Sequence, residues 1–128
     1  IPMEKLIIKE TKHSPLVILD HTTGACEVKG SSFLDNAHEF YTPLISWIRD
    51  YAKKPKGDIK ILFELNYINT SSQRMLFDFL KELNLLHKGG SKVHVDWLYD
   101  ENDYDLRDVG EDQLSFMDFS YKIIEKVS

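Results

Sequence analysis

The chain has 128 residues and a formal net charge of -5, with 42% of its residues hydrophobic and 29% charged. This composition is typical of a folded globular protein and excludes a disordered chain. An acidic chain without a Lys/Arg-rich block does not indicate a nucleic-acid surface, and no apolar run approaches the roughly 20 residues of a membrane span. We therefore expect a single domain over residues 3–128, with no nucleic-acid partner and no membrane insertion.

The N-terminus and the single cysteine indicate how the chain was produced and in which redox setting it works. Ile1 and Pro2 precede Met3, so we expect them to be left from the cleavage of an expression fusion, with Met3 as the natural start. Cys26 cannot form an internal disulfide, which favours a reducing, cytoplasmic setting. No His or basic residue adjoins Cys26 in the sequence, so we expect a small buried side chain there and not a reactive thiol.

The first half of the chain predicts strands followed by a helix. Residues 4–10, 16–20 and 25–29 are strand-like, and residues 21–24 are typical of a hairpin turn. Capping residues follow, and Asp35 or Asn36 is expected to start a helix. Pro43 lies inside that helix, where we expect a kink in one continuous helix. Its apolar stripe repeats at three- and four-residue spacing: Ala37, Phe40, Tyr41, Leu44, Ile45, Ile48 and Tyr51.

The second half alternates strands with helices. A turn is expected at 53–58, followed by a strand at 59–67 with Tyr67 on its apolar face. Residues 72–88 predict the clearest helix, and residues 92–99 predict another strand. A short helix is expected within 100–112, and a final strand at 116–124. The order is βββαβαβαβ. Helices between strands favour crossover connections, so the predicted fold class is α/β, a single domain with a mixed, mostly parallel sheet.

The most informative segment is the hydroxyl cluster Thr70-Ser71-Ser72, which lies between a predicted strand and a predicted helix. Hydroxyl groups at a helix start lie beside unpaired backbone N–H groups at the positive end of the helix. Such a place suits an anion, either bound or attached covalently to a hydroxyl as phosphate. A plain N-cap is the other interpretation that this spacing allows.

Known catalytic patterns are absent from the sequence. There is no phosphate-binding G-x-x-x-x-G-K-[ST] loop and no G-x-S-x-G elbow that would make Ser71 or Ser72 a hydrolase nucleophile. The five histidines are scattered, and the acidic stretch 100–112 lacks the spacing of a calcium loop, which favours a solvated or docking surface there. The aromatic residues Trp47, Tyr51, Trp97 and Tyr99 have core spacing. We therefore expect no catalytic residue, no metal, no cofactor and no enzyme activity.

Three segments carry a resemblance to a known family. They are residues 32–48, residues 65–72 with the Asn-Thr-Ser-Ser motif, and residues 89–112. With these segments the chain resembles the SiaC-type threonine-phosphorylated regulators of bacteria, whose fold is similar to that of STAS domains such as anti-sigma-factor antagonists. Leu34-Asp35-Asn36 departs from the Pro-Glu-Asn that the family often has, and Pro43 leaves the geometry of the first helix open.

The resemblance implies a phosphorylation cycle at Thr70, the threonine of the Asn-Thr-Ser-Ser motif. In that family a protein kinase adds the phosphate and a PP2C-like phosphatase removes it. The unmodified form of the best-known member activates a diguanylate cyclase, which connects the switch to cyclic-di-GMP and biofilm regulation. A STAS-like anti-sigma antagonist or a small-anion-binding domain is the alternative function.

We expect the partner surface to surround Thr70. Backbone N–H groups of Ser71, Ser72 and Gln73 are expected to receive the phosphate oxygens. Several simpler roles stay open: Asn69 as a turn residue, Asn36 as a helix cap, Arg74 as a solvated cation, and Ser71 or Ser72 as the modified residue. The predicted partner-binding residues are Asp35, Asn36, Asn69, Thr70, Ser71, Ser72 and Arg74.

Overall fold

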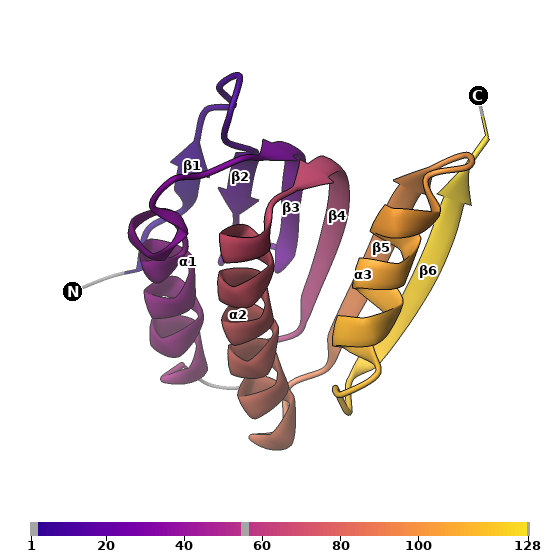
Figure 1. Ribbon diagram of the computed structural model, residues 1–128. Coiled ribbons are helices and arrows are strands. Elements are labelled where there is room, and N and C mark those ends of the chain that lie inside the picture. The colour runs from indigo at the N-terminus through magenta and orange to yellow at the C-terminus, as the bar shows by residue number, and fades with distance from the viewer. Residues whose placement is uncertain (1–2, 55–56, 128) are drawn as a thin grey trace.

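One layer of the molecule is a six-stranded sheet and the other is formed by three helices that cover the same face of it (Figure 1). The computed structural model describes residues 3–54 and 57–127. In chain order the elements are β1 (Leu6–Ile8), β2 (Leu16–Leu19), β3 (Ala25–Ser32), α1 (Ala37–Ala52), β4 (Ile59–Ile68), α2 (Thr70–Lys88), β5 (Val93–Asp100), α3 (Tyr104–Leu114) and β6 (Ser120–Lys126). This order confirms the predicted βββαβαβαβ arrangement.

The strands lie side by side in the order in which they occur in the chain, from β1 to β6. The pairs β1–β2 and β2–β3 are antiparallel, and the three pairs from β3 to β6 are parallel. Successive right-handed crossovers in one direction place all the helices on one side of a sheet. The carboxyl ends of β3, β4 and β5 and the first turns of the helices therefore meet at one edge, the upper edge in Figure 1. The predicted mixed, mostly parallel sheet is confirmed.

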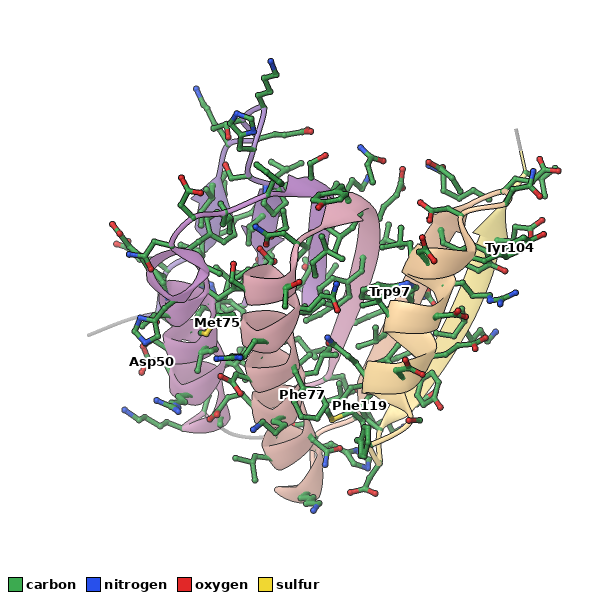
Figure 2. All side chains as sticks on the ribbon, in the orientation of Figure 1. Asp50, Met75, Phe77, Trp97, Tyr104 and Phe119 are labelled. Atoms are coloured by element: carbon green, nitrogen blue, oxygen red, sulfur yellow. The ribbon has the colours of Figure 1, made fainter. Side chains whose placement is uncertain are left out.

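The core lies between the sheet and the helices. Trp97 of β5 is 1% exposed, and its indole N–H donates to the carbonyl of Leu106 in α3 at 3.0 Å. A Cβ atom on Gly110 would lie 2.4 Å from that indole nitrogen, so only glycine allows α3 to pack this closely. Figure 2 shows Met75 between α1 and α2, and Trp97 in the space between the sheet and α3. The aromatic residues predicted for the core, Trp47, Tyr51, Trp97 and Tyr99, are all buried.

The strand β4 differs from the prediction near its carboxyl end. Its register with β3 shifts between Gly30 and Ser31, so Leu65 pairs with Gly30 and Tyr67 pairs with Ser31. One extra residue on one strand reverses which face the following side chains take. Ile68 is therefore buried, and Tyr67, predicted for the apolar face, is 49% exposed.

Several predicted boundaries move by a few residues. The helix α2 begins at Thr70 and not at residue 72, because Asn69 supplies its N-cap. The last strand begins at Ser120 and not at residue 116, because α3 continues to Leu114 and a turn follows it. The helix α1 runs through Pro43 as one continuous helix, as predicted, and the kink expected at Pro43 stays a prediction. The predicted turn at 53–58 lies partly outside the described residues.

The structure also tests the predicted burial of Cys26 and the predicted lack of a membrane-spanning helix. Cys26 is 6% exposed, and burial raises the pKa of its thiol to about 11, so the expected inert side chain is confirmed. Within the part of the chain that the structure describes, no helix combines the length and the apolar character that a membrane crossing requires.

Candidate phosphorylation and docking site

Asn69 holds together the three segments that meet at the upper edge of the sheet. Its backbone N–H donates to the carbonyl of Ser32 at 3.0 Å, and its side-chain amide donates to the carbonyl of Leu34 at 2.9 Å. Its side-chain oxygen accepts the backbone N–H of Ser72 at 3.0 Å, which is an N-cap of α2. The hydroxyl of Ser71 donates to the same carbonyl of Leu34 at 3.0 Å. The first turn of α2 is therefore fixed to the loop that follows β3.

This geometry corrects the prediction of which N–H groups are free. The N–H of Ser72 is bonded to the Asn69 side chain, and the N–H of Gln73 donates to the Asn69 carbonyl at 2.9 Å. Of the three groups predicted to receive phosphate oxygens, only the N–H of Ser71 donates to no atom of residues 3–54 or 57–127. Besides the N–H of Thr70 itself, which also donates to no described atom, one of these three predicted donors is therefore available at the start of α2.

Thr70 is the first residue of α2, and its side chain is exposed. Its hydroxyl forms no hydrogen bond with any residue that the structure describes, whereas the neighbouring hydroxyl of Ser71 is bonded and that of Ser72 is buried. Residues four apart on a helix are neighbours, so Arg74 lies one turn along the same side of α2. Arg74 is exposed and makes no ion pair within the described residues.

The three helices differ in the charge of their first turns. Glu39 lies in the first turn of α1 and Asp105 in that of α3, but the first turn of α2 contains no acidic residue. Acidic side chains at these positions compensate the positive end of the helix dipole. Of the three described helices, α2 is therefore the one whose positive N-terminal dipole has no acidic side chain beside it. A negative group is stabilised there.

Asn36 and Asp35 occupy the loop on the other side of the Leu34 carbonyl. The Asn36 side chain accepts the N–H of Glu39 and donates to its carboxylate, both at 3.1 Å, so it forms a reciprocal cap of α1. Asp35 is exposed and forms no hydrogen bond with the described residues. The structure brings this loop against the start of α2 through Asn69 and Ser71.

Ser72 does not belong to the exposed group. Its side chain is 0% exposed, and its hydroxyl oxygen has no hydrogen-bond partner within the described chain. A fully buried side chain cannot contact a docked protein, so the prediction that Ser72 belongs to the partner surface is corrected. For the same reason Ser72 is not an accessible alternative to Thr70 for modification. The predicted residues that remain at the surface are Asp35, Asn36, Asn69, Thr70, Ser71 and Arg74.

An aromatic cluster beside the hydroxyl groups was missed by the sequence interpretation. Phe33 is 50% exposed and Tyr67 49% exposed, with 5.6 Å between their ring centroids. The ring of His13 lies 5.8 Å from that of Phe33, and the N–H of Phe33 donates to the carbonyl of His13 at 2.9 Å. The shift in β4 register brings Tyr67 to this surface. No alternation pattern announces such a shift, although Gly30 at that point, with φ of 117°, is a hint of irregular strand geometry.

The site has no features of a metal centre. Within residues 3–54 and 57–127, no three His, Cys, Asp or Glu side chains are close enough to hold a metal ion together. Among the described residues, the arrangement offers an accessible hydroxyl, the free backbone N–H groups of Thr70 and Ser71, one unpaired guanidinium and two exposed aromatic rings. This combination can accept a covalent anion and can contact a protein surface.

A family model matches most of the chain. The model of a family described as the SiaC family regulatory phosphoprotein matches residues 8–126. A Pseudomonas aeruginosa protein described as uncharacterized is 26% identical over 121 residues, which cover 94% of this chain and 96% of that protein.

Solved structures agree with this match. The crystal structure of apo-SiaC from Pseudomonas aeruginosa is 25% identical and superposes with a TM-score of 0.87, covering 97% of this chain and 100% of its own. A second structure is that of the diguanylate cyclase SiaD in complex with its activator SiaC from the same organism. It matches with 26% identity and a TM-score of 0.88, covering 94% of this chain and 99% of its own.

Proposed function

Since the chain belongs to the SiaC family of regulatory phosphoproteins, we propose that it is a partner-switching regulator controlled by phosphorylation of Thr70. In this proposal the unmodified form binds and activates an effector protein, and the phosphorylated form does not. The observation that carries the proposal is the exposed Thr70 hydroxyl at the first position of α2, which bonds to no described residue. This oxygen lies at the surface of the folded protein, which is where a kinase is expected to meet it.

The surroundings of Thr70 suit the phosphorylated form. A phosphate adds about -1.5 to -2 charges and three acceptor oxygens. The free N–H of Ser71 and the uncompensated positive end of α2 stabilise these oxygens, and Arg74 can reach them from one turn away. Phosphorylation is therefore expected to leave the fold intact and to change only what can dock on this edge of the sheet.

Docking is expected to involve both the hydroxyl groups and the aromatic cluster. Phe33 and Tyr67 offer apolar rings at the edge that also holds Thr70, and exposed aromatic residues are common energetic centres of protein interfaces. A dianion at Thr70 next to such rings would have to lose water when a partner covers it. Desolvation of an unmatched charge costs several kcal/mol at most interfaces, and repulsion from a partner carboxylate adds to this cost.

The proposed partners follow from the switch and from the similar proteins. A protein kinase and a PP2C-like phosphatase add and remove the phosphate, and the effector is a diguanylate cyclase. The last assignment is supported by the complex of the diguanylate cyclase SiaD with its activator SiaC, to which this chain is similar over 94% of its length. We place the protein in the cytoplasm, where such a cyclase finds its nucleotide substrate.

The experiment compares the protein carrying genetically encoded phosphothreonine at Thr70 with the unmodified protein and with Thr70→Val. A purified diguanylate cyclase of the same genome is the effector, and affinity and cyclic-di-GMP formation are the measurements. The unmodified protein and Thr70→Val are expected to bind and activate. Phosphothreonine at Thr70 is expected to weaken binding by at least about a hundredfold, which corresponds to about 2.7 kcal/mol.

Thr23 provides the matched control. It is an exposed threonine in the turn before β3, at the opposite edge of the sheet, so phosphothreonine there adds the same charge far from Thr70. This form is expected to bind like the unmodified protein. Equal binding by the phospho-Thr70 form would contradict the proposal. Saturable binding of inorganic phosphate by the Thr70→Val protein, without binding of any cyclase, would favour a small-anion-binding domain.

A further inference from the structure

A second hydroxyl, that of Ser120, lies on the sheet face that no helix covers. Ser120 pairs in register with His94 of β5, His94 with Lys60 of β4, and Lys60 with Ala25 of β3. Paired residues in a sheet share a face, so these four side chains form one transverse row. The row lies near the amino ends of the parallel strands, at the edge opposite Thr70.

Ser120 and His94 form part of a hydrogen-bonded chain of three side chains. The Ser120 Oγ atom lies 2.8 Å from Nδ1 of His94, and Nε2 of His94 lies 2.7 Å from Oδ1 of Asp96. An ionised carboxylate can only accept, so Nε2 must carry the hydrogen that it shares with Asp96. In the neutral imidazole, Nδ1 is then left with its lone pair and accepts from the Ser120 hydroxyl. A hydroxyl, a base and a carboxylate that orients the base are the parts of an activated nucleophile.

A hollow of about 540 Å³ opens beside this chain, and its surface is mainly apolar. The side chains of Lys60 and Lys92 line it, and neither makes an ion pair within the described residues. Among the described residues that line it, Asp58 is the one carboxylate, and it accepts the backbone N–H of Lys92 at 3.3 Å. The hollow therefore offers apolar surface for a small organic group and two cations for a negatively charged group.

From this geometry we propose that Ser120 is a nucleophile that accepts an acyl group from a small acyl phosphate. The Ser120 oxygen attacks the carbonyl carbon, and its proton passes to Nδ1 of His94. The bond between the carbonyl carbon and the phosphate oxygen breaks, and the departing phosphate takes the proton from His94. The products are O-acyl-Ser120 and inorganic phosphate, with no oxidant or metal required.

The lining of the hollow determines the chemical class of the donor. The cations of Lys60 and Lys92 stabilise a phosphate leaving group, and the apolar surface accommodates a short acyl chain. The product blocks the hydroxyl that started the reaction, so one acyl group is transferred per chain. Ser120 is thus a site of covalent modification, and it is separate from the switch proposed at Thr70.

The test uses acetyl phosphate as the probe and the whole chain as the protein. Peptide mapping measures the rate at which each hydroxyl gains an acetyl group. Alkaline hydroxylamine distinguishes serine esters, which it cleaves, from lysine amides, which it leaves intact. Ser115 is the internal control, because it is an exposed serine whose hydroxyl, among the described residues, bonds only to the Asp112 carbonyl, at 2.8 Å. Ser120 is expected to react at least about a hundredfold faster than Ser115, the usual contribution of a positioned base.

Two variants separate activation from simple exposure. Gln at position 94 retains polar groups but is not a base, so His94→Gln is expected to reduce the Ser120 rate to that of Ser115. Asp96→Asn, which removes the carboxylate that orients His94, is expected to reduce it by at least about tenfold. Equal rates at Ser120 and Ser115 in the unmodified sequence would overturn the proposal, and this comparison needs no variant to fold. An unchanged rate in a folded His94→Gln protein would overturn it as well.

Discussion

The hydroxyls of Thr70 and Ser120 lie at opposite edges of one sheet and have different surroundings. Thr70 has free backbone N–H groups, an uncompensated helix start and Arg74 near it, but its hydroxyl is hydrogen-bonded to no base among the described residues. Ser120 has the base His94 at 2.8 Å. The first environment stabilises a phosphate once it is attached and depends on a kinase to attach it. The second activates the hydroxyl itself. The comparison shows that the surroundings of a hydroxyl decide whether its modification needs a separate enzyme.

The largest expected effect tests whether charge at the Thr70 edge controls docking. Thr70→Asp places one negative charge there, and we expect it to weaken binding of the diguanylate cyclase by about 2 kcal/mol, roughly thirtyfold. The carboxylate is smaller and less charged than a phosphate, so the effect is below that of phosphothreonine. Isothermal titration calorimetry measures it, with Thr23→Asp as the control of equal charge at the other edge. Equal losses for both variants would mean that net charge, and not position, matters.

The second prediction concerns the aromatic cluster. Tyr67→Ala is expected to weaken cyclase binding by about 1 to 2 kcal/mol, because an exposed ring at the centre of an interface contributes energy of this size. The stability of the free protein should change little, since Tyr67 is half exposed. Phe116→Ala is the control, because Phe116 is 73% exposed and contacts Phe77 of α2 away from the Thr70 edge. A larger loss of binding for Phe116→Ala would place the interface elsewhere.

The third prediction compares two helix caps. Asn36→Ala removes the cap of α1, and we expect it to lower the free energy of unfolding by about 1 kcal/mol. Asn69→Ala also removes the amide that bonds to the Leu34 carbonyl at 2.9 Å, so we expect a loss of about 2 kcal/mol. Urea denaturation provides both values. Similar losses would show that the bond to Leu34 contributes nothing to the Thr70 edge.

The last prediction is that a change at one edge of the sheet has no effect on the function of the other edge. Thr70→Val should leave the acetylation rate of Ser120 unchanged, and Ser120→Ala should leave cyclase binding unchanged. Changes at distant positions without shared partners usually add within about 0.5 kcal/mol. The double variant should therefore behave as the sum of the single ones. A clear departure from additivity would mean that the sheet couples its two edges.

The sequence predicts most of the fold because its signals are periodic. The apolar stripes of α1 and α2 and the alternation in β5 determine the element order, and Thr70 is found at an exposed helix start as expected. The predictions are wrong where a single local contact determines an element boundary or the face that a side chain takes. The Asn69 cap moves the start of α2 and uses the N–H of Ser72, and the irregular register beside Gly30 moves Tyr67 to the surface. The contact between Ser120 and His94 joins two residues that are 26 positions apart in sequence, and only His94 and Asp96 on one strand give a hint of it.

The most direct test of the switch is mass spectrometry of the protein isolated from its own cells, in fractions bound to and free of the cyclase. Our account predicts one phosphate per modified chain, mapped to Thr70, and present only in the fraction free of the cyclase. Phosphorylated Thr70 in the cyclase-bound fraction, or a phosphate that maps only to other residues, would contradict it.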